Sequence, residues 1–178
     1  MRVIFKTSIS LADAELGKVY NSMKPVRWYN YIEVAVISII ATLALTFIFE
    51  ALGLTETRTY SEIAQRQFYG HSSFAETIGL YCIVSPVVEE LIFRFGIFNL
   101  LLMIIRRLGI FNNKNVHLSV WITALLFGIY HMNLVQGLYA FLMGLVITYS
   151  YAVYRKFSIP VVAHICANAT ALFITYIF

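Results

Sequence analysis

Charged residues are scarce in this chain of 178 residues, where Asp, Glu, Lys and Arg together make up 12%. A soluble domain normally carries about 25% charged residues. Hydrophobic residues reach 60%, and several mainly apolar runs of about 20 residues are long enough to cross the hydrocarbon core of a bilayer as helices. The sequence therefore predicts an all-α, polytopic membrane protein, with about five to six transmembrane helices and a functional site buried between them.

Cysteine is almost absent, and Cys82 and Cys166 lie far apart in apolar segments, without the CxxC spacing of a zinc or redox site. We interpret them as two buried thiols. The chain also lacks the HExxH, GxSxG and Walker glycine patterns, which leaves a zinc protease, a serine hydrolase or a P-loop site of those types without sequence support. The net charge of +4 does not indicate a nucleic-acid partner, because the basic residues flank the apolar runs.

The apolar segments divide the chain into an N-terminal part and one membrane domain. We expect residues 1–30 to be a cytoplasmic or interfacial segment with a short capped helix after Ser10, and residues 31–178 to be a single integral membrane domain. The segment 74–105 exceeds one upright span, and Pro86 predicts a break or kink near its middle. The expected apolar segments are 31–54, 74–105, 116–132, 134–154 and 159–178.

The basic residues are distributed unevenly along these segments. Of 13 Lys and Arg residues, five precede the first segment, three lie in 106–114 and two at 155–156. Only Arg58 and Arg66 fall on the opposite side if the segments alternate across the membrane. The positive-inside rule therefore predicts a cytoplasmic N-terminus.

Ionisable side chains inside the apolar segments are the strongest functional signal, because each costs roughly 2.5 to 3.5 kcal/mol on insertion scales. Glu90 and Arg94 are four residues apart, so on a helix they share a face and form either a structural ion pair or a support for a site. Glu89 points about 100° away from Glu90 and lacks that partner. A lone buried carboxylate is costly, which favours a functional role for Glu89.

Two further segments supply nitrogen-bearing side chains. His131 ends an apolar segment one turn after Phe127, and His164 shares a helix face with Asn168. Each feature has a structural interpretation, as a helix-end histidine or an interhelical hydrogen-bonded pair. Together, a carboxylate, two imidazoles and an amide from three segments form a plausible hydrolytic set. A divalent metal held by Glu89, His131 and His164 is a second interpretation.

Three motifs follow one another on separate apolar segments: EELIFR at 89–94, FGIYH at 127–131 and HICAN at 164–168. This order resembles the CAAX protease and bacteriocin-processing (Abi) family, whose pattern is EExxxR, FxxxH and HxxxN or HxxxD. The resemblance covers about residues 74–178, the expected protease core. It implies a glutamic intramembrane endopeptidase without metal or cofactor, working in a cavity open to the cytosolic side.

The resemblance also implies roles for individual residues. Glu89 and His131 would activate water, while His164 and Asn168 would stabilise the oxyanion. Glu90, Arg94 and Phe127 would support this set, with the ion pair holding Glu89 in position. The expected substrate is a membrane-associated protein or peptide, such as a prenylated protein or a signal or bacteriocin precursor, and the short loops resemble those of bacterial plasma-membrane members.

Other functions remain open at this point. A non-proteolytic immunity or peptide-binding membrane protein would use the same polar cluster for recognition, and a proton-coupled carrier would use it for transport. The sequence does not indicate an oligomeric state. Counted along straight helices, Glu89 and His131 lie roughly 22 to 24 Å from the inner side but His164 only about 8 Å. This mismatch predicts either tilted or broken helices, or a re-entrant dip at residues 157–160.

Overall fold

A computed structural model describes residues 25–57, 61–62, 65, 73–108 and 115–177 of the chain. These residues form helices joined by short turns, with no strand among them, which confirms the all-α expectation. The expected surface helix after Ser10 lies outside the described residues.

Three of the described helices are long and apolar enough to cross a membrane. They are α2 (Trp28–Ala51), α8 (Leu134–Tyr154) and α9 (Ser158–Ile177), with mean hydropathies of 2.4, 1.4 and 1.5 over their most apolar stretches. A shorter apolar helix, α7 (Asn115–Tyr130), precedes α8. The expected total of five to six spans remains a prediction.

The chain from Phe74 to Leu108 is helical throughout, but its type of helix alternates. In order, it consists of α4 (Phe74–Thr77), the π-helix η1 (Ile78–Val84), α5 (Ser85–Glu90), the π-helix η2 (Leu91–Phe98) and α6 (Asn99–Leu108). The helix therefore has no break at Pro86, and the kink expected there as the alternative remains a prediction. Pro86 lies in the first turn of α5, and the wider turns of η1 before it accommodate the missing N–H.

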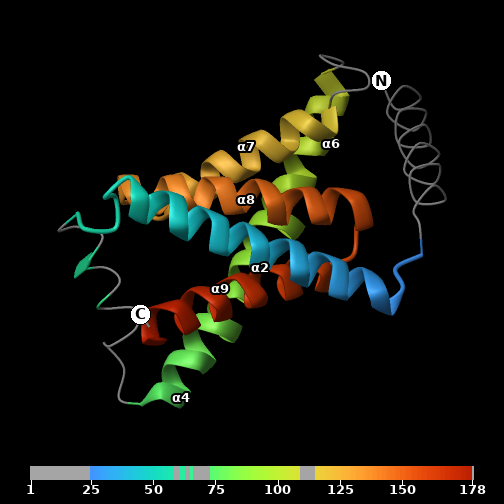
Figure 1. Ribbon diagram of the computed structural model, residues 1–178. Helices are drawn as coiled ribbons and strands as arrows, with labels where there is room; N and C mark the ends of the chain where they lie inside the picture. Colours follow the sequence, from blue (N-terminus) through green and yellow to red (C-terminus); the bar gives the residue numbers. More distant parts are fainter. Residues whose placement is uncertain (1–24, 58–60, 63–64, 66–72, 109–114, 178) are drawn as a thin grey trace, which may run out of the picture.

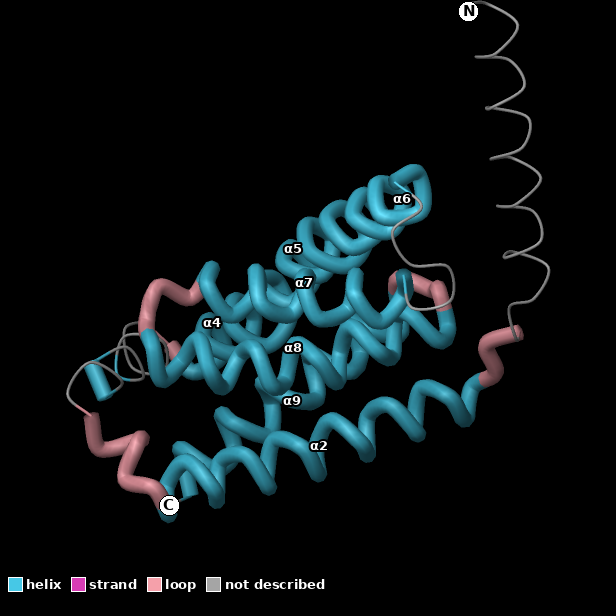
Figure 2. Tube along the Cα trace, turned by 90° about the horizontal axis from the view of Figure 1, so that it is seen from above, coloured by secondary structure: helices cyan, strands magenta, loops and turns pink. Residues whose placement is uncertain are grey.

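The helices form two sets that cross obliquely (Figures 1 and 2). Helices α2, α8 and α9 lie side by side, with α8 antiparallel to the other two and α7 packed along α8. The helical path from α4 to α6 crosses this set, and α5 contacts α9 near the crossing point. Helix α9 begins at Ser158, and the oblique crossing brings the distant motifs to one place. The re-entrant dip at residues 157–160 remains a prediction.

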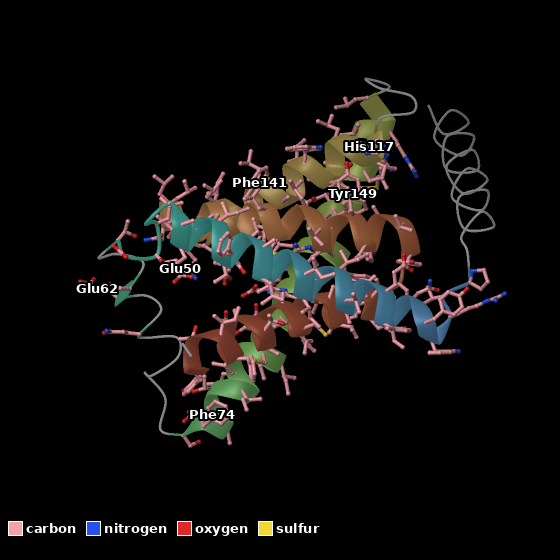
Figure 3. All side chains as sticks on the ribbon, viewed as in Figure 1. Glu50, Glu62, Phe74, His117, Phe141 and Tyr149 are labelled. Carbon is pink, nitrogen blue, oxygen red and sulfur yellow. The ribbon has the colours of Figure 1, made fainter. Side chains whose placement is uncertain are left out.

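The two ends of the bundle are built differently. At one end, α7 and α8 meet in a tight turn, where Asn133 accepts a hydrogen bond from the Gln136 backbone N–H. At the other end, α8 stops at Arg155, whose left-handed backbone (φ 51°) turns the chain into α9. Figure 3 shows Glu50 and Glu62 at the first of these ends, and His117 with its hydrogen-bond partner Tyr149 toward the second.

Candidate active site

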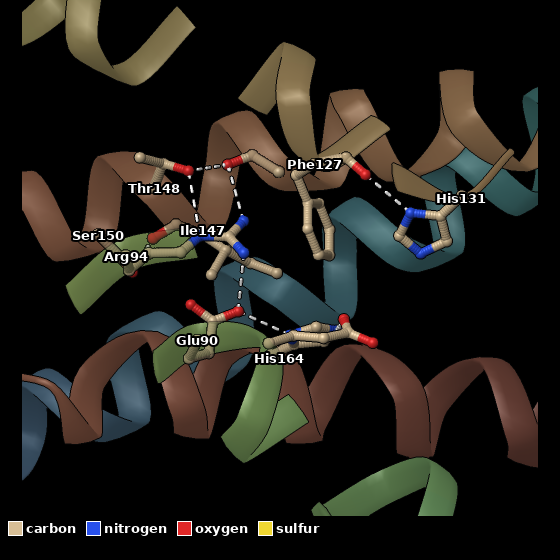
Figure 4. Close-up of polar contacts among 10 residues, drawn as sticks. Glu90, Arg94, Phe127, His131, Ile147, Thr148, Ser150 and His164 are labelled. Atoms are coloured by element: carbon tan, nitrogen blue, oxygen red, sulfur yellow. Dashed lines mark hydrogen bonds and ion pairs between the residues drawn. The ribbon is translucent and has the colours of Figure 1, made fainter. Parts of the chain in front are cut away.

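A buried ion pair lies at the centre of the bundle. Glu90 and Arg94 are both fully buried, and Arg94 Nη1 donates to Glu90 Oε1 at 3.0 Å (Figure 4). The expected pairing of these two residues along one helix face is therefore present. Two charges taken out of water need further hydrogen bonds as well as each other, because desolvation otherwise exceeds their attraction.

Helix α8 and helix α7 supply the remaining contacts of the Arg94 guanidinium. Its Nε donates to Thr148 Oγ1 at 3.2 Å, and its Nη2 donates to the Gly144 carbonyl oxygen at 3.4 Å. The Thr148 hydroxyl donates to the same carbonyl oxygen at 2.6 Å. The ring of Phe127 covers the guanidinium, with a distance of 4.3 Å from Arg94 Cζ to the ring centroid, which is cation–π geometry. The ion pair is thus fixed by two other helices.

His164 links this ion pair to Glu89. Its Nδ1 lies 2.7 Å from Glu90 Oε1 and its Nε2 lies 3.7 Å from Glu89 Oε2. A carboxylate only accepts hydrogen bonds, so Nδ1 carries the proton of the shorter contact. The longer distance exceeds a hydrogen bond and leaves Glu89 available to another polar atom. Glu89, expected to have no partner, therefore faces a histidine, and Glu90 orients that histidine.

The spacing of Phe127 and His131 also has a structural reason. At the end of α7, the His131 backbone N–H donates to the Gly128 carbonyl oxygen, three residues back, at 3.2 Å. The Phe127 carbonyl oxygen loses that helical partner and accepts from His131 Nδ1 at 2.8 Å instead. With Nδ1 as the donor, Nε2 of a neutral ring keeps its lone pair. His131 is thereby held as a potential base or hydrogen-bond acceptor.

Asn168 is positioned by an irregularity of η1. In η1 the Ser85 N–H bonds to the Leu80 carbonyl oxygen, five residues back. The matching partner for Tyr81 would be residue 86, which is proline and has no N–H. The Tyr81 carbonyl oxygen accepts instead from Asn168 Nδ2, at 2.9 Å. Pro86 therefore does not break the helix, and it donates no N–H to the Tyr81 carbonyl oxygen, which accepts from Asn168.

A cavity of about 180 Å³ lies between these groups, and an engineered cavity of about 150 Å³ is large enough to hold benzene. Glu89, His131, His164 and Asn168 all line it. Glu90 and Arg94 do not line it; they lie behind His164. The other lining residues are Thr46, Tyr81, Ser85, Phe127, Gln136, Tyr139, Ala140, Met143, Ile147, Ala167, Ala171, Ile174 and Thr175.

The structure thus brings the three motifs together, but it also includes residues that the sequence did not single out. Thr148, Gly144 and Gln136 belong to α8, and Thr46 belongs to α2. A threonine in an apolar segment is too common a feature to mark Thr148 in advance. Among the described residues, no group of three or more His, Cys, Asp and Glu is arranged to hold a metal ion.

Residues 71–170 match the model of one protein family, described as type II CAAX prenyl endopeptidase Rce1-like. Because the match covers more than half of the chain, the protein belongs to this family, and the resemblance noted in its three motifs is confirmed. The family and the apolar helices together identify a membrane protein of the peptidase class. Neither a search of curated proteins nor a search of solved structures found a match.

Proposed function

We propose that this protein is a glutamic intramembrane endopeptidase that hydrolyses a peptide bond with water activated by Glu89. One observation carries the proposal: a carboxylate from α5, an imidazole from the α7–α8 turn, and an imidazole and an amide from α9 line one cavity between apolar helices. A structural polar cluster would need each group to be paired with another. Glu89 Oε2 faces His164 Nε2 at 3.7 Å, which is an ion-pair distance but is longer than a hydrogen bond.

Glu89 and His131 suit the activation of water. The Glu89 side chain is 17% exposed, which is consistent with contact with a water-filled cavity, and its distance of 3.7 Å from His164 Nε2 is longer than a hydrogen bond. Nε2 of His131 accepts a second hydrogen bond from this water, since Nδ1 is committed to the Phe127 carbonyl. Water held by two acceptors is oriented for attack on a carbonyl carbon.

His164 and Asn168 suit the stabilisation of the oxyanion. As an imidazolium, His164 donates from Nδ1 to Glu90 and from Nε2 toward the cavity. Asn168 uses one N–H for the Tyr81 carbonyl and retains the other. With His164 protonated, the charges of Glu89, Glu90, Arg94 and His164 sum to zero, which suits a cluster buried among apolar helices.

In the proposed reaction, the water oxygen forms a bond to the carbonyl carbon while Glu89 takes the released proton. The resulting oxyanion accepts hydrogen bonds from His164 and Asn168, a contribution of about 2.7–4 kcal/mol for one donor in a known case. The C–N bond then breaks, and the leaving amine takes the proton from Glu89. Water is consumed, a carboxylic acid and an amine are formed, and the enzyme returns to its starting state.

We further propose that the protein is a multi-pass protein of a bacterial plasma membrane with a cytoplasmic N-terminus, five to six spans and its protease core at about residues 74–178. Its substrate would be a membrane-associated peptide or protein. Nothing in the cavity favours the alternative of non-proteolytic immunity.

The test is cleavage by purified protein in detergent. Wild type, Glu89→Gln and Glu50→Gln would be incubated with prenylated and unprenylated membrane-proximal peptides and analysed by mass spectrometry. Glu50 is an exposed carboxylate at the end of α2 outside the cavity lining, so its variant is a matched control. We expect products from wild type and Glu50→Gln only. Full cleavage by Glu89→Gln would exclude the proposed mechanism.

A further inference from the structure

Arg155 occupies a position where helices commonly end in glycine. It follows the last residue of α8, and its left-handed backbone (φ 51°) places its N–H 2.7 Å from the Tyr151 carbonyl oxygen. Glycine adopts this conformation freely, whereas a side chain makes it less favourable. A residue held in an unfavourable conformation points to a function of its side chain.

The Arg155 guanidinium is partly buried against two aromatic rings. Its Cζ lies 5.2 Å from the centroid of the Phe98 ring and 5.4 Å from that of the Tyr151 ring. Both rings belong to one buried cluster, which consists of Phe98, Leu102, Val120 and Tyr151. Such cation–π contacts hold the guanidinium in place, but they provide no oxygen acceptor for its N–H groups.

Arg106, in the last turn of α6, brings a second positive charge to the same place. It follows Leu102 by four residues, so the two side chains share one face of α6. Burial lowers the pKa of the Arg155 guanidinium, and the positive charge of Arg106 lowers it further, whereas Tyr151 raises it. The two guanidinium groups are therefore close enough to repel each other.

Neither guanidinium is neutralised by an acidic side chain in the part of the chain that the structure describes. Glu33, near the start of α2, uses its Oε2 to accept from Tyr154 at 2.7 Å and from Asn30 at 3.3 Å. Two neighbouring cations, one of them partly buried, are unfavourable without an anion. An anion bound by both would remove their repulsion and accept their hydrogen bonds.

The surroundings of the two arginines indicate which anion fits. The apolar stretch of α8 ends at Tyr154, so we place Arg155 at the boundary where lipid headgroups begin. Exposed apolar side chains lie nearby on both helices: Ile104 and Leu108 on α6, and Val153 on α8. A phospholipid combines a phosphate with acyl chains that cover such side chains, whereas free phosphate does not.

We propose that Arg106 and Arg155 bind the phosphate group of an anionic phospholipid, with its acyl chains along the exposed apolar side chains of α6 and α8. Guanidinium groups suit this ligand because they bind phosphate through paired N–H···O bonds. The bound lipid connects α6 to the end of α8. Neither arginine lines the cavity, so this site is separate from the candidate active site and does not rest on the proposed function.

Lipid-dependent thermal unfolding tests the proposal. The purified full chain in detergent would be titrated with phosphatidylglycerol, with zwitterionic phosphatidylcholine or with inorganic phosphate. Because a ligand that binds the folded state raises Tm, each titration gives an apparent Kd. We expect phosphatidylglycerol to raise the Tm of wild type and the other two probes to have much weaker effects.

Single substitutions localise the binding. Arg106→Gln should weaken the apparent affinity for phosphatidylglycerol about tenfold, because a hydrogen bond to a charged group is lost. Arg107→Gln is the matched control, since it removes the same charge from the same turn of α6, but Arg107 points about 100° away from Arg106. We expect the control to change the affinity by less than about twofold.

Arg155→Gly separates lipid binding from folding. Glycine suits the left-handed conformation at this position, so the Tm of this variant in lipid-free detergent should stay close to that of wild type. Its apparent affinity for phosphatidylglycerol should nevertheless fall about tenfold.

An undiminished effect of phosphatidylglycerol in both Arg106→Gln and Arg155→Gly would overturn the proposal, as would the absence of any shift in wild type. An equal loss of affinity in Arg107→Gln would replace the site with a general effect of charge. Equal stabilisation by phosphatidylcholine would refute the preference for an anionic headgroup. Stabilisation by inorganic phosphate alone would refute the lipid and assign the two arginines to a free anion.

Discussion

The side-chain amide of Asn168 donates to the backbone carbonyl oxygen of Tyr81 at 2.9 Å, between α9 and the π-helix η1. This contact joins the motif HICAN, at residues 164–168, to η1, which contains none of the three motifs. Pro86, five residues after Tyr81, has no N–H to donate to the Tyr81 carbonyl oxygen. A proline that sequence reasoning treats as a helix breaker thus takes part in building the site.

Replacing Pro86 with alanine should weaken this contact. The alanine would supply the missing N–H, which would compete with the Asn168 amide for the Tyr81 carbonyl oxygen. A hydrogen bond contributes about 1 kcal/mol, so we expect kcat to fall roughly tenfold or less while the helix remains folded. Kinetics of peptide cleavage would measure the change, with Pro25→Ala, in an exposed position outside the helices, as the control. An unchanged kcat would show that Pro86 does not influence the site.

Removing the Asn168 amide should affect the transition state more than substrate binding. Loss of one oxyanion donor lowers kcat by about 10²–10³-fold in a known case, and we expect a similar loss for Asn168→Ala with little change in KM. Asn99→Ala is the control, because Asn99 likewise donates to a helix carbonyl, that of Phe95 at 2.8 Å, but lies outside the cavity lining. Equal losses of kcat in both variants would indicate a general packing effect instead.

Thr148 should act through Arg94. Thr148→Val removes the hydroxyl that accepts from Arg94 Nε and leaves a buried charged donor unpaired, so we expect a loss of about 1–3 kcal/mol in the free energy of unfolding. Cleavage should slow as well, because Arg94 and Glu90 hold His164. Thr148→Ser keeps the hydroxyl and should largely restore both properties. Unfolding in an SDS titration and kcat would be measured on the three proteins; identical stability of Thr148→Val and wild type would contradict this role.

The close packing of α7 on α8 should be sensitive to a single methyl group. A Cβ at Gly128 would lie 2.7 Å from the Gly137 carbonyl oxygen. Because this oxygen is a backbone atom of α8, the contact cannot be relieved by a side-chain rotation. We expect Gly128→Ala to destabilise the protein by about 1–3 kcal/mol and to displace His131, three residues later.

Gly79→Ala provides the control for this packing, because a Cβ there has nothing within 4 Å. Alanine favours helix over glycine by up to about 1 kcal/mol, so the control should be neutral or stabilising. Thermal unfolding and cleavage rates would compare the two variants. Full stability and activity in Gly128→Ala would show that α7 and α8 can separate without cost.

Much of the fold was accessible from the sequence. The apolar segment expected at 134–154 coincides with α8, and the other segment boundaries differ from the helices by up to three residues. These boundaries follow from apolar runs and polar turns, which are local properties. The oblique crossing of α4–α6 over α8 and α9 was not accessible, because it depends on packing between segments far apart in the chain.

In the candidate site, too, local features could be predicted from the sequence, whereas contacts between distant segments could not. The pairing of Glu90 with Arg94 follows from helical spacing alone. The contact of Glu90 with His164 joins residues 74 positions apart and needed the assembled bundle. The contact of Asn168 with the Tyr81 carbonyl oxygen was inaccessible for another reason: a π-helix has no clear sequence signature, so Pro86 predicted a break or kink in its place. The roles of Glu89, His131, His164 and Asn168 stay predictions until variants are measured.

The ion pair at the centre of the bundle also bears on how the chain enters the membrane. Glu90 and Arg94 lie four residues apart in one helix, whereas Gly144, Thr148 and His164 follow 50 to 74 residues after their partners in the cluster. During synthesis, the charged segment therefore emerges long before those partners exist. Each charge has its counter-ion one helical turn away in the same segment. The pair can therefore neutralise itself when this segment inserts into the bilayer, before α8 and α9 have been synthesised.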